Sequence, residues 1–253
     1  MMKKLTFVTL LAYDYRYAEL ALRSYYDIAD EILLGIDADR LSWMKLPFHI
    51  DMDEVRALVA DIDREGKIRI IEGNFHSSDD PMANDVLERT VLAGHAAPGN
   101  WIIQIDSDEI LLNGAEFRDW LWAQDPVHFD VQAQWITVFK KFSNQFLLID
   151  PPGESVPVAT MARNSYRLSR NTGQPHVMSP LKLLHLSYGR TPEEVLQKLT
   201  NWGHARDFDV HCFFRFWQSI SLDNYTQARD FHPLTATTWR SLKLVEIGTA
   251  VQS

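Results

Sequence analysis

The chain has 253 residues, of which 46% are hydrophobic and 23% are charged, and its net charge is -9. This length and composition suit one large globular domain with a sizeable core. The acidic balance argues against a broad nucleic-acid-binding face, which would need a basic stripe. The single cysteine, Cys212, excludes an intramolecular disulfide and a cysteine zinc site. We expect it to be a small buried hydrophobe beside Phe213 and Phe214.

No apolar run reaches the length of a membrane span. The N-terminus imitates a short signal peptide, because Lys3 and Lys4 precede an apolar stretch over residues 5–12. No small-x-small cleavage site follows, however, and the stretch also makes a good first strand. We therefore expect a strand and a cytoplasmic protein.

The first 112 residues alternate between strand and helix patterns. We predict strands at residues 5–11, 31–36, 67–71 and 101–105, and helices at residues 17–29, about 51–62 and 82–95. Asp51 or Asp53 caps the middle helix, and Gly66 stops it. This alternation predicts βαβ units and a parallel sheet.

The rhythm changes after residue 112. We expect a helix at 114–124, β stretches at 127–141 and 158–169, a loop at 150–154, a strand at 180–186, a helix opening at Thr191, and a helical, aromatic-rich remainder that includes 213–217. No linker divides the chain. We predict a single α/β domain over residues 1–253, with a nucleotide-binding half at 1–112. The acceptor half and C-terminal helices follow at 113–253.

The chain is organised around residues 101–112, which read as a short buried strand running into acids. Side-chain alternation puts Asp106 and Asp108 on one face, with Ser107 between them. Two adjacent carboxylates repel each other unless a cation or proton lies between them, and a hard divalent cation is the usual solution. The plainer interpretation is that both acids form a turn and cap the helix near Gly114.

These features together resemble the GT-A glycosyltransferases, specifically family-two-like enzymes. The resemblance rests on the βαβα half, on a second strand ending at Asp37-Ala38-Asp39, and on a fourth strand ending at Asp106-Ser107-Asp108-Glu109. The segment from His185 to Glu194 also looks like the place where a histidine completes a metal site before a helix that opens in Pro-Glu-Glu. The resemblance covers roughly residues 5 to 202. It implies a GT-A, Rossmann-like and mostly parallel sheet flanked by helices, with a mixed β and helical C-terminal extension.

The resemblance also implies roles for particular residues. Asp106, Asp108 and His185 would hold a divalent cation, Mn²⁺ or Mg²⁺, against the diphosphate of a nucleotide-sugar donor. The nucleotide pocket would include Thr9, Tyr13, Asp37, Asp39, Arg89, Asp106 and Ser107. Tyr13 could stack on the base, and one of the two acids after the second strand would accept a hydrogen bond from it.

Several of these residues also have a plainer explanation. Asp37 and Asp39 could be solvated turn residues, His185 a satisfied core histidine, and Arg89 the surface partner of Asp85 or Glu88. Trp135 and Trp202 could stack on an acceptor, although burial is the ordinary fate of a tryptophan. The second strand also lacks the usual Ser/Thr-rich turn of the family, which leaves recognition of the base open.

An inverting enzyme needs a carboxylate base within reach of the acceptor hydroxyl. Glu109, Glu154 and Asp150 are the candidates, with Asp207 and Asp209 also open. We therefore expect a metal-dependent, inverting glycosyltransferase; inversion rests on family analogy alone. The acceptor stays open (a glycan, a lipid-linked glycan or another molecule), as does a homo-oligomer.

Two alternatives remain. One is a glycosyltransferase-like module that binds nucleotide and sugar without turnover. The other is a sugar-nucleotidyltransferase, which would normally carry a glycine- and arginine-rich loop where this chain has residues 11–15.

Overall fold

The computed structural model describes residues 4–125, 128–163, 166–246 and 248. Within these residues ten strands form one sheet, in the order β10-β7-β6-β8-β4-β1-β2-β3, with β5 paired to β9 and β9 to β6. The strands are β1 (Leu5–Leu11), β2 (Glu31–Asp37), β3 (Ile68–Gly73), β4 (Trp101–Gln104), β5 (Glu109–Leu111), β6 (Asp130–Lys141), β7 (Gln145–Asp150), β8 (Ser155–Thr160), β9 (His176–His185) and β10 (Ser241–Glu246).

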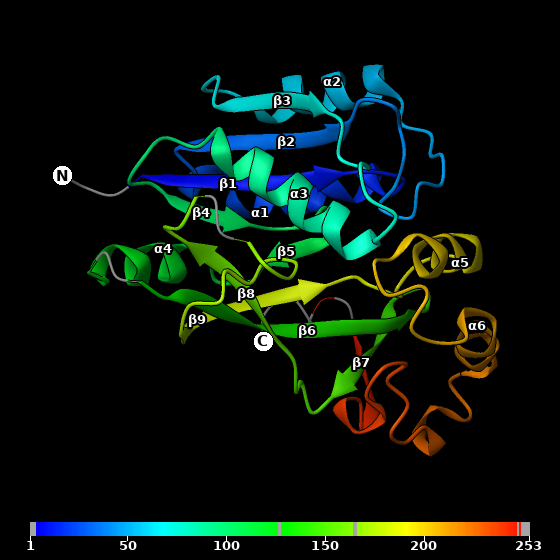
Figure 1. Ribbon diagram of the computed structural model, residues 1–253. Coiled ribbons are helices and arrows are strands. Elements are labelled where there is room, and N and C mark those ends of the chain that lie inside the picture. Colours follow the sequence, from blue (N-terminus) through cyan, green and yellow to red (C-terminus); the bar gives the residue numbers. More distant parts are fainter. Residues whose placement is uncertain (1–3, 126–127, 164–165, 247, 249–253) are drawn as a thin grey trace.

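The helices lie on both sides of the sheet and at its far end (Figure 1). They are α1 (Ala18–Tyr25), α2 (Met52–Ile62), α3 (Pro81–Gly94), α4 (Gly114–Ala123), α5 (Pro192–Asn201) and α6 (Val210–Ser219), with short 3₁₀ turns at Tyr15–Tyr17, Tyr26–Ile28, Tyr225–Gln227 and Ala236–Thr238. Over the described part of the chain, no helix combines the length and the apolar character needed to span a membrane.

The N-terminal half is a parallel sheet with helices on both faces. β1 pairs in parallel with β2 and β4, and β2 pairs in parallel with β3. Every residue of β1 is buried, as expected for a strand covered on both sides. In Figure 1, α3 lies in front of these strands and α1 and α2 lie behind them.

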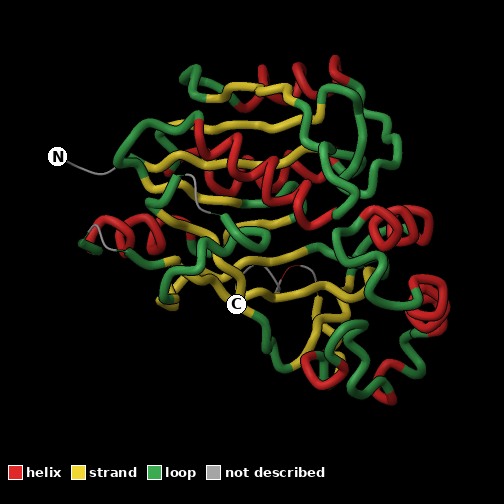
Figure 2. The backbone as a smooth tube through the Cα atoms, in the orientation of Figure 1, coloured by secondary structure: helices red, strands yellow, loops and turns green. Residues whose placement is uncertain are grey.

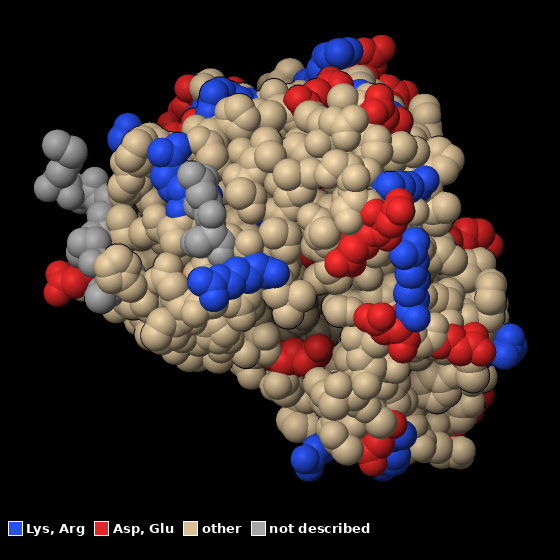
Figure 3. Space-filling view, viewed as in Figure 1, with Lys and Arg blue, Asp and Glu red and all other residues tan. Residues whose placement is uncertain are grey.

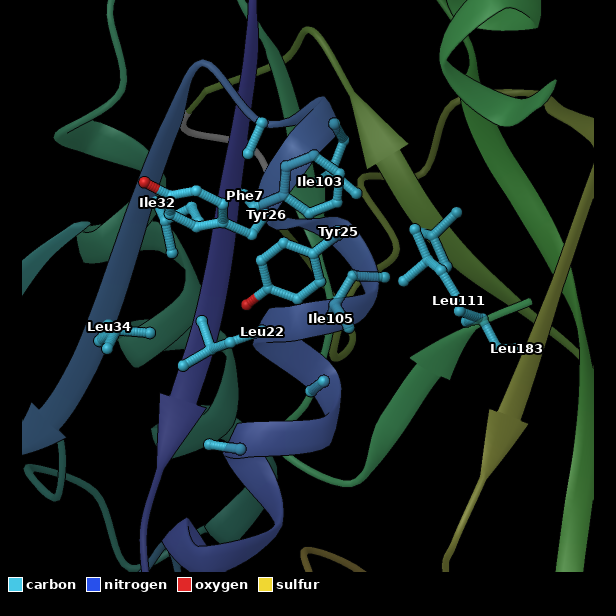
Figure 4. Close-up of a cluster of buried hydrophobic side chains, with 14 of the residues drawn as sticks. Phe7, Leu22, Tyr25, Tyr26, Ile32, Leu34, Ile103, Ile105, Leu111 and Leu183 are labelled. Carbon is cyan, nitrogen blue, oxygen red and sulfur yellow. The ribbon is translucent and has the colours of Figure 1, made fainter. Parts of the chain in front are cut away.

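The core on the α1 side is built from aromatic and branched aliphatic side chains (Figure 4). Phe7 stacks on Tyr25 with ring centroids 4.5 Å apart, and Leu22 is fully buried beside them. On the opposite face, Leu92 of α3 packs against Val8 and its neighbours. The acids at the carboxyl ends of β2 and β4 thus follow strands that are packed on both faces.

The C-terminal half is a mixed sheet with its own aromatic core. β6 pairs with β7 and β8 antiparallel and with β9 in parallel. Tyr188, Phe213, Trp217 and Trp239 form the centre of a second cluster under α5 and α6. Figure 2 shows the strands of both halves running through the middle of the molecule, with α5 and α6 at one end.

This is the α/β class expected from the sequence, a sheet flanked by helices with a mixed β and helical C-terminal part, and that class is confirmed. The first three strands, the capped helix after Asp51 and the helix opening at Thr191 all form where expected. The aromatic segment 213–217 lies in helix α6, with Phe213 and Trp217 buried.

Four expectations were wrong or incomplete. The β stretch expected over 158–169 ends at Thr160 as part of β8, and β7 was not expected. The C-terminal remainder is not all helical, because its last described segment forms β10 against β7. Cys212 is exposed rather than buried, because it lies on the outer face of α6. Val127 and residues 164–165 of the expected β stretches lie outside the described residues.

Candidate active site

A cavity of about 530 Å³ opens at the carboxyl ends of β1, β2 and β4. In open α/β sheets, ligands bind outside these strand ends. Side chains from α3, α5, β6, β8 and the C-terminal segment complete its wall. The side of the molecule in Figure 3 is hollowed between α3 and the strands below it, and acidic side chains lie at the lower edge of the hollow.

The expected acids lie in a tight turn between β4 and β5. The Glu109 backbone N–H donates to the Asp106 carbonyl at 3.1 Å, so the chain reverses within three residues of the strand. Asp106, Ser107 and Asp108 all line the cavity. β5 then pairs with β9 in a register that sets Glu109 opposite His185, which brings the histidine beside the acids.

Two guanidinium groups face Asp106. Arg89 of α3 donates to both carboxylate oxygens at 3.1 and 3.2 Å, and Arg170 lies 2.6 Å from one of them. Burial by itself would raise the pKa of Asp106, but Arg170 and Arg89 hold that pKa well below its usual range. Arg89 also donates to Asp85, but this pair is buried, so the helix-surface alternative is wrong and Arg89 lies beside the acids as the resemblance implied.

Asp108 is almost fully buried and has cationic partners of its own. One carboxylate oxygen accepts from Arg190 at 2.5 Å and from Lys198 at 2.7 Å, and His185 Nε2 lies 3.5 Å from it. Burial opposes ionisation, yet Lys198, His185 and Arg190 hold the pKa of Asp108 well below its usual value. Asp108 is therefore ionised and already compensated by side chains.

The residues present do not fit a divalent cation as they stand. A cation bound by Asp106 would meet two guanidinium groups, and one bound by Asp108 would meet Arg190 and Lys198, so like charges would repel at close range. Among the described residues, no set of three or more His, Cys, Asp or Glu side chains is arranged to hold a metal ion. The use of Mn²⁺ or Mg²⁺ by Asp106, Asp108 and His185 stays a prediction.

Two of the residues expected to bind the nucleotide, Tyr13 and Asp37, line the cavity, and a third, Thr9, does not. The Asp37 carboxylate accepts from the backbone N–H groups of Phe75, Leu41 and Asp39, at 2.9 to 3.1 Å. These bonds, with His76 at 3.0 Å, hold its pKa below the usual value against the effect of burial. Asp37 thus shapes the loop after β2.

Thr9, Asp39 and Tyr13 were also expected to bind the nucleotide. Thr9 is buried and shares a hydrogen bond with Tyr25, and Asp39 is bonded by Asn74, so neither side chain points freely into the cavity. Burial raises the pKa of Tyr13 well above its usual value, which keeps its hydroxyl protonated. Tyr13 lines the cavity, and its stacking on a base stays a prediction.

Two neighbouring cavity residues were not expected from the sequence. Trp43 Nε1 donates to the Glu88 carboxylate at 2.7 Å, and burial raises the pKa of Glu88 to about 8. Two features of the sequence could have indicated them. Trp43 lies in a polar loop, and Glu88 lies on the same face of α3 as buried Asp85 and Leu92, because the three residues have helical spacing.

The five candidate bases differ in their surroundings. Glu109 is fully buried, bound by two Arg170 bonds at 2.9 Å and by Trp135 at 2.8 Å. Asp209 caps α6, Asp207 pairs with His204, and Asp150 ends β7 away from the cavity lining. Glu154 is the one of the five that lines the cavity.

Glu154 lies at the end of the cavity built by the C-terminal half. Trp239 Nε1 donates to one carboxylate oxygen at 2.5 Å, and His232 Nε2 lies 3.7 Å from the other. Burial raises the pKa of Glu154, while Trp239 and His185 oppose the rise. His185, which lies 3.5 Å from Asp108, thus also lowers the pKa of Glu154.

Aromatic side chains form much of the same wall. Trp135, Trp202, Trp239 and Tyr188 all line the cavity. Trp135 packs on His185 with ring centroids 4.7 Å apart. The two tryptophans expected as acceptor stackers thus reach the cavity, although Trp135 also supports the buried Glu109.

Three important cations were missed from the sequence: Arg170, Arg190 and Lys198. A hairpin places Arg170 beside Asp106. In this hairpin the Arg167 N–H donates to the Asn171 carbonyl at 2.8 Å, and Ser169 adopts a positive φ of 47°. Lys198 offered a signal, because it lies three residues after buried Val195 and beside buried Leu199 on α5. A lysine on the inner side of a helix needs a partner.

Comparisons with known proteins add little. No family model matches the chain, and no curated protein matches it. A solved structure of S. aureus TarS 1-349 is similar over 53% of this chain and 36% of its own, with 15% identity and a TM-score of 0.34. A mycobacterial protein is similar over 53% of this chain and 41% of its own, with 16% identity and a TM-score of 0.29. The chain thus spans well under half of either structure, and likeness at this level carries no argument about function.

Proposed function

We propose that this protein is a glycosyltransferase that moves a sugar from a nucleotide-sugar donor to an acceptor hydroxyl, with inversion at the anomeric carbon. One observation carries the proposal. A single cavity joins the carboxyl ends of β1, β2 and β4 to Glu154, a partly buried carboxyl group of the other half. The first end suits a nucleoside diphosphate, and the second suits an acceptor with its base.

The chemistry needs three things from the chain. Tyr13 and the loop held by Asp37 would receive the nucleoside, and the cations around Asp106 and Asp108 would face the diphosphate. Glu154 would take the proton from the acceptor hydroxyl as its oxygen bonds to the anomeric carbon. The bond from that carbon to the diphosphate oxygen breaks, and the nucleoside diphosphate leaves with the electron pair.

The role of Glu154 is supported by its surroundings. Its raised pKa makes it a stronger base than an ordinary carboxylate, and Trp239 holds one oxygen in place. Trp202 and Trp239 line the same cavity and offer apolar faces of the kind on which sugar rings stack. The acceptor we infer is therefore one with an exposed sugar or similar hydroxyl-bearing ring.

The first test is calorimetric titration of UDP, GDP, CDP and dTDP in the presence of Mn²⁺. Binding of one nucleotide identifies the base of the donor, and its nucleotide sugar is then assayed for release of nucleoside diphosphate. Glu154→Gln should reduce turnover by about 10²- to 10⁴-fold without weakening nucleotide binding, as expected for loss of a general base.

Asp150→Asn is the matched control, because this candidate carboxylate lies outside the cavity lining and its removal should leave turnover unchanged. If no nucleotide binds, the glycosyltransferase proposal fails. If one binds but no donor is hydrolysed or transferred, the protein is a binding module. Formation of a nucleotide sugar from a sugar phosphate and a nucleoside triphosphate would instead indicate a nucleotidyltransferase.

A further inference from the structure

We propose that Lys198 binds the diphosphate of the donor directly. Its ammonium group would supply the positive charge that the sequence-based prediction gives to a divalent cation. This inference rests on the proposed function, because it names the ligand of the diphosphate in the same cavity. Its basis is the difference between Lys198 and the other cations around the two acids.

Three of the four cations are fixed. Arg89, Arg170 and Arg190 are each almost fully buried, with side chains at most 3% exposed. Each is also shared between two carboxylates: Arg89 by Asp85 and Asp106, Arg170 by Glu109 and Asp106, Arg190 by Asp14 and Asp108. Moving Arg89 or Arg170 toward a ligand would leave buried Asp85 or Glu109 without its cation, which is costly. Moving Arg190 would break its ion pair with Asp14 as well as the one with Asp108.

Lys198 differs in each respect. Its side chain is 15% exposed, it lines the cavity, and its one ion pair within the described chain is with Asp108 at 2.7 Å. Its ammonium group sits on a flexible four-carbon stem that can reorient. Its helix is firmly anchored, because Thr191 and Glu194 form a reciprocal capping box two turns earlier.

The charge balance at Asp108 makes the exchange inexpensive. Arg190 and Lys198 both contact the same Asp108 oxygen. When Lys198 turns to a phosphate oxygen, Arg190 stays on Asp108 and keeps it compensated. A divalent cation would have to approach Asp108 past both of these groups, against their repulsion. Lys198 can therefore meet the ligand without leaving a buried charge unpaired.

The test compares nucleotide binding without and with metal. Protein is dialysed against EDTA and titrated calorimetrically with UDP, GDP, CDP and dTDP, and the titrations are repeated in Mn²⁺. We expect one nucleotide to bind with the same affinity in both. Lys198→Met should weaken that binding by about 10- to 100-fold, as expected for loss of a hydrogen bond to a charged group. Lys198→Arg should retain most of the affinity.

Asp108→Asn should change nucleotide affinity in opposite directions depending on whether a metal ion or Lys198 binds the diphosphate. If Asp108 holds a metal, the variant loses binding; if Lys198 holds the diphosphate, the variant frees the ammonium group and binds at least as tightly as wild type. Lys243→Met, an exposed lysine on β10, is the control and should leave affinity unchanged. Thermal unfolding of each variant verifies that it is folded.

The outcomes are distinct. Binding that disappears in EDTA and returns with Mn²⁺ overturns the role of Lys198 but leaves the proposed glycosyltransferase standing. Unchanged affinity in Lys198→Met also overturns it, whatever the metal dependence. A wild-type protein that binds no nucleotide under either condition overturns both this inference and the proposed function.

Discussion

The contact between Arg170 and Glu109 offers the sharpest test of the site's construction. Glu109 has no exposed surface, and Arg170 gives it two bonds of 2.9 Å. In Arg170→Met, the Glu109 carboxylate keeps the N–H groups of Trp135 and Asp106 but has no cation. Removing one partner of a buried ion pair costs about 3–5 kcal/mol.

That cost should be visible in thermal unfolding. For a chain of this size, 1 kcal/mol shifts Tm by roughly 2–4 °C, so Arg170→Met should lower Tm by about 6–20 °C. Circular dichroism at neutral pH, with urea unfolding alongside it, measures both Tm and the free energy of unfolding. Arg56→Met provides the control, because the Arg56–Asp53 pair is exposed and should contribute under about 1 kcal/mol.

A second substitution identifies the cause. Arg170→Met combined with Glu109→Gln removes the unpaired charge, so the double variant should be more stable than the sum of the two single losses by about 0.5–3 kcal/mol. A Tm shift for Arg170→Met no larger than that of Arg56→Met would refute the reasoning. So would a double variant that loses the full sum, because Arg170 would then act through packing alone.

Three further predictions follow from other contacts. Turnover should rise with pH through the raised pKa of Glu154. Trp239→Phe removes a hydrogen bond that lowers this pKa, so the variant should move the midpoint of the kcat/KM profile to higher pH. An unmoved midpoint would exclude Glu154 as the base. Because Glu88 has a pKa of about 8 when folded against an ordinary 4.5, the folded state holds its proton longer, and the free energy of unfolding should fall between these pH values by up to about 1.4 kcal/mol per unit. Glu88→Gln should lack that slope in urea unfolding. Gly35→Ala would place a methyl group onto the buried Leu92 side chain and should lower the free energy of unfolding by about 1–3 kcal/mol. In a protein that already carries Leu92→Ala, the Gly35→Ala substitution should cause no further loss of that free energy.

The sequence was informative wherever local pattern decides structure. Continuous apolar runs define β1 and β2, and the Thr-Pro-Glu-Glu opening defines the start of α5, so these elements form where expected. The position of Asp106 and Asp108 at the end of β4 follows from the same kind of reasoning. β10 was missed because it pairs with β7 across more than ninety residues, which local pattern does not encode. β7 was also missed, although it pairs with its sequence neighbour β6.

The partners of the acids could not be predicted for a related reason. Arg170 and Lys198 reach Asp106 and Asp108 from segments 64 and 90 residues further along the chain. Nothing in the spacing of an arginine indicates which carboxylate it will meet. The sequence therefore indicated that the negative charges of Asp106 and Asp108 must be balanced, and a metal ion was the prediction because it is the usual counter-charge. Arg89 was expected beside these acids, but nothing indicated that Arg170, Arg190 and Lys198 reach the same place.

The sharing of each arginine between two carboxylates explains how this charge density can be both stable and useful. An arginine bound to a single acid would be free to follow a ligand, and the fold would lose an ion pair whenever it did. Arg89, Arg170 and Arg190 each bridge two acids, so the network holds α3, the hairpin 167–171 and the turn after β9 in place whether or not a ligand is present. Lys198, in contrast, has one ion pair, and Asp108 would keep Arg190 if that pair broke. The buried arginines thus stabilise the fold, and Lys198, the partly exposed cation among these four, is the one that we propose binds the ligand.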